Sequence, residues 1–122
     1  MRALALSKLA LSALGVLLFI GAAWAADPVG TYTCLGHSPD GGAAYKGVVT
    51  VVKTGETYQV TWLIGGKKTT GTGVGDEGFL AVSYQSGKDT GLALYGSVKA
   101  DWKGVWTYQN GTSMGDESWT RQ

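Results

Sequence analysis

The sequence offers few combinations of a nucleophile with a base that could activate it. Its only histidine, His37, and its only cysteine, Cys34, lie three positions apart. Catalysis by a thiol needs a base that faces it, whereas strand alternation places Cys34 with Tyr32 on a buried face, away from a loop histidine. We therefore interpret Cys34 as a small buried residue and His37 as a solvated one. The sequence predicts no catalytic residues and a protein that is not an enzyme.

Paired acidic residues occur twice, as Asp76-Glu77 and Asp116-Glu117, each directly after a glycine. Neighbouring side chains of a strand point to opposite faces, which does not suit a general acid and base acting on one bond. We interpret both pairs as acidic turns. A calcium site would require the two turns to meet at one end of the fold, and one His with one Cys does not complete a zinc or copper site. We therefore predict no metal and no cofactor.

Aromatic residues are the most prominent candidates for ligand binding. The stretch WKGVWTYQNG, residues 102–111, places Trp102, Trp106 and Tyr108 on one face of a strand and ends on Asn-Gly. Four of the five tryptophans and all six tyrosines lie after residue 25. Aromatic rings fill cores and also line binding sites, so their role depends on the fold that positions them.

The elements that position these rings are strands, because short runs rich in Val, Thr, Tyr and Trp alternate with glycine-rich turns and no helical periodicity appears. Tight turns are predicted at Gly55 and at Gly65-Gly66, and Asn110-Gly111 is typical of a two-residue hairpin. The longest connections are expected at 36–44 and 85–90. We expect eight strands, at about residues 30–35, 45–53, 57–64, 67–74, 79–84, 91–97, 102–108 and 112–121.

One face of each strand is expected to be buried. The inward sets that alternation predicts are Tyr58, Val60, Trp62 and Ile64; Leu80, Val82 and Tyr84; Leu92 and Leu94; and Trp102, Gly104, Trp106 and Tyr108. Eight consecutive antiparallel strands with one apolar face remove their exposed edges by closing. The predicted fold is all-β, an eight-stranded antiparallel up-and-down β-barrel, with a two-sheet β-sandwich as the alternative. Glycines inside strands suit the bends of closure.

The interior of an eight-stranded barrel is just wide enough to be filled by side chains or to hold one small ligand. Both outcomes are compatible with the aromatic content of this chain. In the hollow case, we expect Tyr58, Trp62, Tyr84 and Trp106 to form the walls of the site. In the filled case, function moves to the loops, where His37, Asp40, Lys88 and Asp89 are the candidate partner-binding residues.

The first 25 residues have the features of a signal peptide. Arg2 and Lys8 form a positive region, an apolar run covers residues 9–22, and Ala23-Trp24-Ala25 is typical of a cleavage site. The apolar run is shorter than the roughly 20 residues that span a bilayer, so we predict cleavage after Ala25 and no membrane span afterwards. One domain, residues 26–122, would then be periplasmic or secreted.

The charge balance excludes some classes of partner. Without Arg2 and Lys8, eight of the ten basic residues remain against nine acidic ones, and no block of like charge is present. Binding of nucleic acid or of an anionic lipid surface depends on a basic patch. We therefore predict no nucleic-acid partner.

Several of the predicted strands resemble those of a known family. The segments are YQVTWLIGG at 58–66, GTGVGD at 71–76, FLAVSY at 79–84 and GLALY at 91–95. They are similar to small exported alphaproteobacterial proteins commonly labelled fibronectin-binding proteins, and the similarity extends over most of the chain after residue 25. This resemblance implies an exported binding protein but assigns no site residue. The similarity to avidin-like and lipocalin-like barrels is one of architecture only.

The sequence therefore leads to one main functional hypothesis and two alternatives. The main hypothesis is a non-catalytic, adhesin-like exported protein that binds fibronectin or another matrix or envelope protein through barrel loops. The first alternative is a lipocalin-like or avidin-like carrier of a small apolar or aromatic ligand inside the barrel. The second is an inhibitor of an envelope enzyme.

Overall fold

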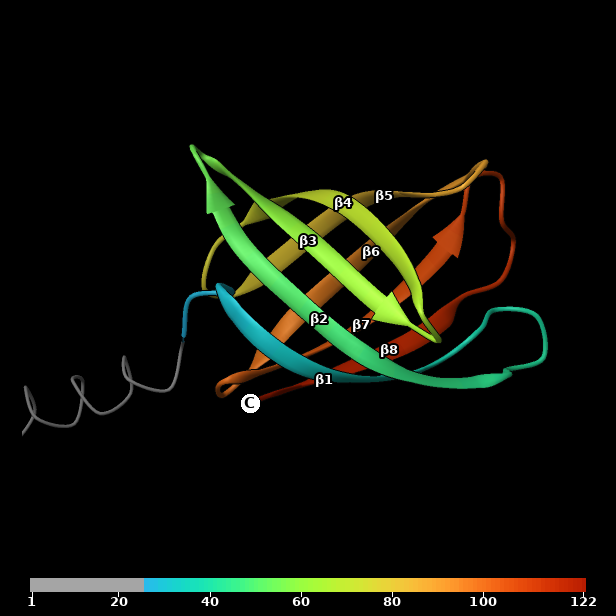
Figure 1. The fold of residues 1–122 in the computed structure, drawn as a ribbon, viewed down its shortest axis with the longest axis horizontal. Helices are drawn as coiled ribbons and strands as arrows, with labels where there is room; N and C mark the ends of the chain where they lie inside the picture. Colours follow the sequence, from blue (N-terminus) through green and yellow to red (C-terminus); the bar gives the residue numbers. More distant parts are fainter. Residues whose placement is uncertain (1–25) are drawn as a thin grey trace, which may run out of the picture.

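Eight antiparallel strands close into one barrel in the computed structural model, which describes residues 26–122 (Figure 1). The strands are β1 (Gly30–His37), β2 (Ala44–Thr54), β3 (Thr57–Ile64), β4 (Lys67–Gly75), β5 (Phe79–Ser86), β6 (Asp89–Val98), β7 (Asp101–Tyr108) and β8 (Gly115–Arg121). Each strand pairs with its neighbours along the chain, and β1 pairs with β8. The predicted up-and-down barrel is confirmed, and the alternative sandwich is wrong. The predicted signal peptide, residues 1–25, lies outside the described residues.

The connections differ from the sequence prediction in two places. The turn at Gly55 and the turn at Gly65-Gly66 join their strands through two residues with positive φ at the glycines, as expected. The predicted connection 85–90, however, is reduced to the two-residue turn Gly87-Lys88, because its other four residues belong to β5 and β6. The Asn110-Gly111 pair does not form a two-residue hairpin, because β8 begins only at Gly115 and leaves the six-residue connection 109–114.

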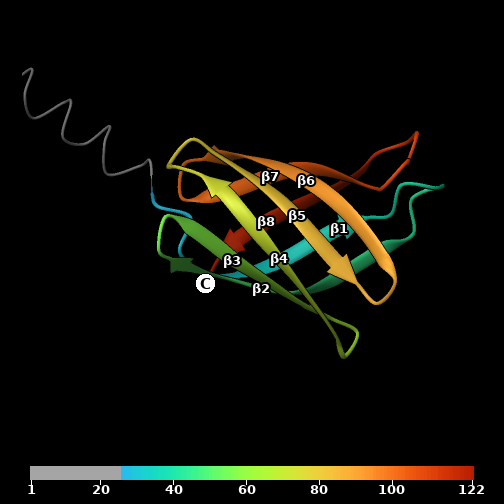
Figure 2. The ribbon, with the colours of Figure 1, turned by 90° about the horizontal axis from the view of Figure 1, so that it is seen from above.

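The longer β7–β8 connection is stabilised by its own hydrogen bonds and by the β1–β2 connection. The Thr107 hydroxyl donates to the Ser113 carbonyl oxygen at 2.8 Å, and the Ser113 hydroxyl donates to Asp40 at 2.9 Å. Figure 2 shows these two connections projecting from the same end of the barrel. We call this end, formed by the connections 38–43, 65–66, 87–88 and 109–114, the open end.

The opposite end, which we call the closed end, is plugged by the chain that enters β1. Pro28 is fully buried there, and its carbonyl oxygen accepts a 2.6 Å hydrogen bond from the Tyr32 hydroxyl. The Arg121 guanidinium lies over the Tyr32 ring and donates to the carbonyl oxygens of Asp27, Val29 and Ala100. A planar group with several donors is suited to this role, because it satisfies three backbone acceptors at once.

The inward faces of β3, β5 and β7 are those predicted from alternation, but the prediction for β6 is wrong. Leu92 and Leu94 are 58% and 53% exposed, and the inward residues are Gly91, Ala93 and Tyr95. Alternation fails here because both faces of the strand carry small or apolar residues. The register decides instead, since it places Tyr95 opposite Gly104 on β7.

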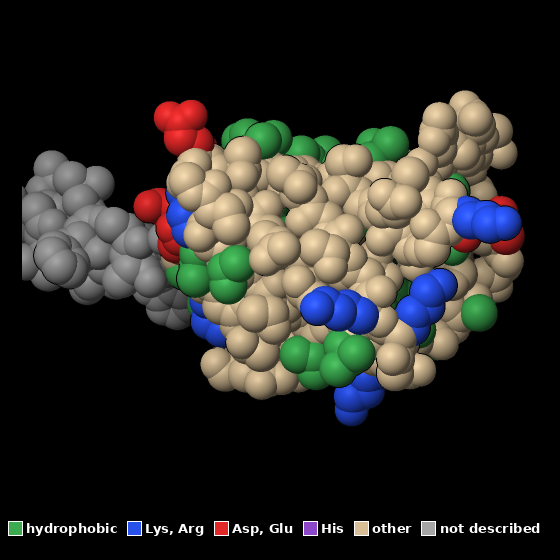
Figure 3. Space-filling model, turned by 45° about the horizontal axis from the view of Figure 1, so that its top comes forward, with side chains coloured by type: hydrophobic (Ala, Val, Ile, Leu, Met, Phe, Trp, Pro, Cys, Tyr) green, Lys and Arg blue, Asp and Glu red, His purple; other side chains and the backbone are tan. Residues whose placement is uncertain are grey.

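The outer face of the barrel therefore carries exposed apolar residues. Val74, Ala81, Leu94 and Val105 are successive cross-strand partners on β4 to β7 and form one row on the outside. Figure 3 shows hydrophobic side chains in several separate groups on one face of the molecule.

Glycines on the inner face lie opposite aromatic residues of the neighbouring strand. Four such cross-strand pairs are Gly36 with Tyr45, Gly91 with Tyr84, Gly104 with Tyr95, and Gly115 with Trp106. A Cβ atom at any of these glycines would overlap the ring of its partner. The glycines therefore make room for aromatic rings that lie flat against the barrel wall, which gives them a packing role beyond the bends expected from the sequence.

This packing predicts opposite outcomes for two alanine substitutions. In Gly104→Ala the new methyl group overlaps the Tyr95 ring and the Leu94 carbonyl oxygen, so we expect a loss of about 1–3 kcal/mol in the free energy of unfolding. Gly96→Ala is the matched control, because Gly96 is exposed and its Cβ position is in open space. We expect its effect to be within about 0.5 kcal/mol. Urea unfolding followed by circular dichroism measures both, and equal losses would contradict this account of the glycines.

Candidate ligand-binding site

A cavity of about 310 Å³ occupies the barrel interior at the open end. Its lining comes from strands β2 to β7 and from the β1–β2 connection, and it combines aromatic, polar and charged side chains. The lining residues are Ser38, Tyr45, Trp62, Ile64, Lys67, Thr69, Tyr84, Ser86, Asp89, Tyr95, Trp106 and Tyr108. The barrel is therefore filled toward its closed end and hollow toward its open end. The sequence was compatible with a filled or a hollow interior, and each of these describes one half of the molecule.

Six aromatic rings line the cavity, and four of them form a connected series that we call the aromatic girdle: Tyr45, Trp62, Tyr84 and Trp106. Tyr45 and Tyr84 each meet Trp106 nearly edge to face, with ring centroids 6.2 Å apart. Trp62 meets Tyr84 in the same way at 5.9 Å. Edge-to-face contacts fix the orientation of neighbouring rings. The girdle is thus a wall of mutually packed rings that come from β2, β3, β5 and β7.

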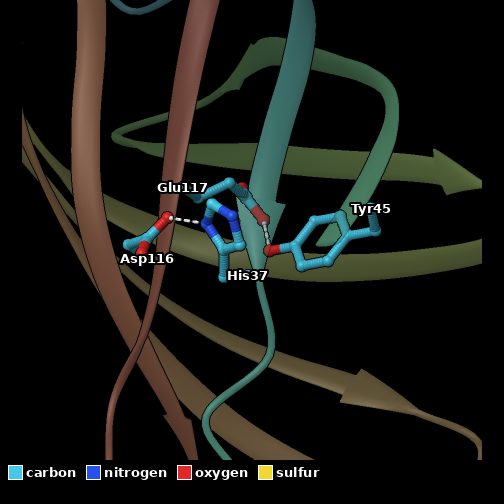
Figure 4. A network of polar contacts seen from close by, with 4 residues as sticks. All are labelled: His37, Tyr45, Asp116 and Glu117. Carbon is cyan, nitrogen blue, oxygen red and sulfur yellow. Dashed lines mark hydrogen bonds and ion pairs between the residues drawn. The ribbon is translucent and has the colours of Figure 1, made fainter. Parts of the chain in front are cut away.

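Directly behind this wall lies a buried carboxylate, that of Glu117, which is only 5% exposed. Its Oε1 atom accepts hydrogen bonds from Trp62 Nε1 at 2.8 Å, from the Tyr95 hydroxyl at 2.8 Å and from Trp119 Nε1 at 2.6 Å. Its Oε2 atom accepts one from the Tyr45 hydroxyl, seen in Figure 4. Three of these four donors also line the cavity, so Glu117 is separated from the cavity by a single layer of side chains.

The four partners of Glu117 are suited to its ionised form. An indole N–H only donates, and the two tyrosines donate their phenol protons. Burial, followed by the nearby Glu117 charge, raises the pKa of Tyr45 and of Tyr95 well above the usual range, so both phenols keep the protons that they donate. The result is a negative charge inside the barrel, and all of its described hydrogen-bonding partners are neutral groups.

Cys34 lies next to this charge on β1 and is fully buried, as the sequence predicted. Burial and then the neighbouring Glu117 carboxylate raise the pKa of its thiol. A thiol held in its protonated form is a poor nucleophile. His37 lies on the opposite, outer face of β1, so the two residues do not face each other.

The indole N–H of Trp106 is buried without a hydrogen-bond partner among the described residues. Its edge lies against Gly115, where a Cβ atom would touch Nε1 and Cε2. The N–H is close enough to the Tyr45 oxygen to act on it electrostatically, but the geometry does not make a hydrogen bond. The polar edge of Trp106 is therefore sealed against the wall of the barrel.

The rim of the open end carries the residues that the sequence assigned to partner binding. His37 ends β1, and its Nδ1 atom lies 2.9 Å from Asp116 of β8, as Figure 4 shows. Both side chains are more than half exposed, so the interaction is a surface one of modest energy. Asp40 accepts the hydrogen bond from Ser113 described above, while Lys88 and Asp89 lie at the β5–β6 turn.

The four residues expected to form the cavity wall are only partly brought together. Trp62, Tyr84 and Trp106 line the cavity, but Tyr58 is buried nearer the closed end, with Lys53 over its ring. Sequence reasoning missed Tyr45, Tyr95 and above all Glu117. The available signal was the alternation of Glu117 with Trp119, since the burial of one residue implies the burial of the other.

The acidic pairs do not form a metal site. Asp76 and Glu77 lie in the β4–β5 turn at the closed end, and Asp116 lies near the open end, so the two pairs do not meet. Asp116 and Glu117 point to opposite faces, as predicted, but the interpretation of Glu117 as a turn residue is wrong, because it lies within β8. Within residues 26–122, no cluster of three or more potential metal ligands occurs.

Comparisons with known proteins give no family assignment. No protein-family model matches the chain, and no curated protein matches it significantly.

In the described part of the chain, no helix has the length and apolar character needed to cross a membrane. The function is therefore inferred from the geometry of the cavity.

Removing the carboxylate should destabilise the barrel. In Glu117→Leu three buried donors and the partly buried Tyr45 hydroxyl lose their acceptor, so we expect a loss of about 3–5 kcal/mol in the free energy of unfolding. The control is Asp116→Asn on the neighbouring, exposed position, for which less than about 1 kcal/mol is expected. Chemical denaturation of the two variants measures the difference. A Glu117→Leu variant as stable as the unmodified protein would disprove the stabilising role of these hydrogen bonds.

The stability of the protein should fall in alkaline solution. Burial raises the pKa values of Cys34, Tyr45, Tyr84 and Tyr95, so the unfolded chain releases these protons at a lower pH than the folded one. The stabilisation is complete below the unfolded pKa values, about 8.5 for a thiol and about 10 for a phenol. As pH rises from these values toward the folded ones, each group lowers the free energy of unfolding by up to about 1.4 kcal/mol per pH unit.

Urea unfolding between pH 7 and 11 tests this expectation. The variant Cys34→Ala serves as the control, because it lacks the thiol and should lose the decline between about pH 8.5 and 10 while keeping the steeper one above it. A free energy of unfolding that stays constant up to pH 11 would rule out the assignment.

Proposed function

We propose that this protein binds a small ligand in the cavity at the open end of its barrel. The observation that carries the proposal is the cavity itself, about 310 Å³ in volume and lined by the aromatic girdle. Ligand sites are concave, mostly apolar and typically about 300–1,000 Å³ in volume, so this cavity suits a compact ligand. Rings that are packed against one another before binding also reduce the entropy that binding would otherwise cost.

The distribution of polar groups favours a ligand with an apolar body that enters the barrel. Most rings in the deeper part of the cavity have hydroxyl or N–H groups that already have partners, such as the Tyr84 hydroxyl, which donates to the Thr107 carbonyl oxygen at 3.0 Å. The exception is Trp106, whose buried N–H lies against Gly115 instead. Free polar side chains lie nearer the rim, where Ser38, Lys67 and Asp89 line the opening. These groups are placed to contact the outer part of a ligand.

Binding without catalysis is part of this proposal. Two observations support it: the Cys34 thiol keeps its proton, and His37 lies on the outer face of the same strand. The resemblance to small exported proteins and the features of residues 1–25 support an exported protein, in the periplasm or outside the cell. A carrier or a ligand sensor of the cell envelope is consistent with these features.

Binding of a protein partner at the open end is the second candidate function. One observation favours it, namely the hydrogen bond from Ser113 to Asp40, which joins the two longest connections into one ridge beside the cavity. The sequence suggests two kinds of partner. One is a matrix protein such as fibronectin, and the other is an envelope enzyme that the ridge would inhibit. Asp40→Ala should then weaken capture of that partner without changing the affinity for a small ligand.

Titration with a neutral hydrophobic dye tests the main proposal. N-phenyl-1-naphthylamine should bind saturably and accept energy from Trp62 and Trp106, both of which line the cavity. In Ser86→Phe the added ring occupies the cavity, so we expect the dissociation constant of the dye to rise at least about tenfold, a change of roughly 1.4 kcal/mol. Fluorescence titration of the unmodified and variant proteins measures the change.

The matched control for this titration lies on the same strand. Ser83 of β5 is exposed on the outer face of the barrel, so Ser83→Phe adds the same ring without entering the cavity and should leave the dissociation constant unchanged. The proposal fails if the unmodified protein shows no saturable binding, or if the two variants weaken binding equally.

A further inference from the structure

The charge behind the aromatic girdle indicates which class of ligand the cavity prefers. Glu117 is buried, its four described donors are neutral, and hydrogen bonds from neutral groups do not cancel its net charge. In the protein interior such a charge acts over longer distances than in water, because the effective dielectric constant is lower. The cavity is therefore a region of negative potential, and an anionic ligand is disfavoured there.

The rings of the girdle add to this preference. The face of an aromatic ring is the negative part of its quadrupole and attracts cations. Tyr45 and Trp62 donate their polar hydrogens to Glu117, which increases the electron density of both rings by polarisation. The polar edge of Trp106 is sealed against Gly115, so this residue offers the cavity ring surface rather than its N–H donor.

We propose that the ligand is an organic cation, with an amine or quaternary ammonium group held among the rings of the aromatic girdle in front of Glu117. This inference rests on the proposed function, since it specifies the ligand of the same cavity. Quaternary ammonium groups combine a positive charge with an apolar surface and are recognised in proteins by cages of aromatic rings. A cavity with aromatic walls and a carboxylate behind them meets both requirements.

The charges at the rim do not reverse this preference. Lys67 and Asp89 line the opening with opposite signs, and both are exposed. Exposed charges are screened by salt over about 8–10 Å at ordinary ionic strength, whereas Glu117 is shielded from solvent. The net charge of the lining residues together with Glu117 is negative.

Two probes of nearly equal shape test the proposal on the unmodified protein. Choline carries a trimethylammonium group, and 3,3-dimethyl-1-butanol has the same outline with carbon in place of nitrogen. We expect choline to bind at least about tenfold more tightly, although it is better hydrated, because a desolvated cation–π contact contributes up to about 2 kcal/mol or more. Displacement of N-phenyl-1-naphthylamine gives both dissociation constants, and shifts of the indole N–H resonances report the site.

Two variants separate the roles of charge and rings. Glu117→Gln keeps an acceptor and the side-chain shape but removes the charge, so choline should bind at least about fivefold more weakly while the neutral probe changes less than twofold. Asp116→Asn is its control, because it removes a charge from the outer face and should leave both affinities unchanged. Trp106→Leu, which leaves the Glu117 hydrogen bonds in place, should reduce the preference for choline toward equality.

The outcomes distinguish this inference from the proposed function. If the neutral probe binds as tightly as choline or more tightly, the cation proposal is overturned, while binding in the cavity stands. If neither probe displaces a dye that itself binds saturably, the cation proposal is overturned in the same way. If the dye does not bind either, both proposals are wrong.

Discussion

The structure depends on one electrostatic constraint, the complete hydrogen bonding of a carboxylate inside a β-barrel. Desolvating an ionised group costs several kcal/mol, and this cost is offset only when its acceptor positions are satisfied. Glu117 meets this condition with donors from β2, β3, β6 and β8 itself. These hydrogen bonds orient the rings that carry the donors, and three of those rings line the cavity.

Glycine residues provide the space for these rings, because a residue without a side chain lets a neighbouring ring approach its backbone. At four inward-facing aromatic residues the neighbouring strand carries glycine, as in the pairs Gly104 with Tyr95 and Gly36 with Tyr45. The rings can then lie against the barrel wall instead of crossing the interior. Toward the closed end, where Val49, Val51 and Leu80 replace this pattern, the interior is filled. The same barrel is thus solid at one end and hollow at the other.

The sequence was sufficient for the fold but not for the site. Alternation and glycine turns predict eight strands and their closure, because both signals are local. The β6 face, the Asn110-Gly111 connection and Glu117 depend on contacts between distant strands, such as the pairing of Tyr95 with Gly104 and the hydrogen bond from Ser113 to Asp40. A glutamate beside an aspartate after glycine has the local features of a turn, which outweigh its alternation with Trp119, whereas the register with Gly104 places it inside the barrel.

The presence of a charge at this position bears on function. Replacement of a buried ionic group by well-packed apolar residues of similar volume is often neutral or stabilising, so stability alone does not require a carboxylate between Tyr45 and Trp119. Hydrophobic side chains at these positions would fill the same space without a desolvation cost. The carboxylate does what such a core would not, since it orients the donors of three cavity-lining rings and gives the cavity a negative potential. Both effects act on the contents of the cavity, so a charge at this position is what the proposed ligand recognition would need.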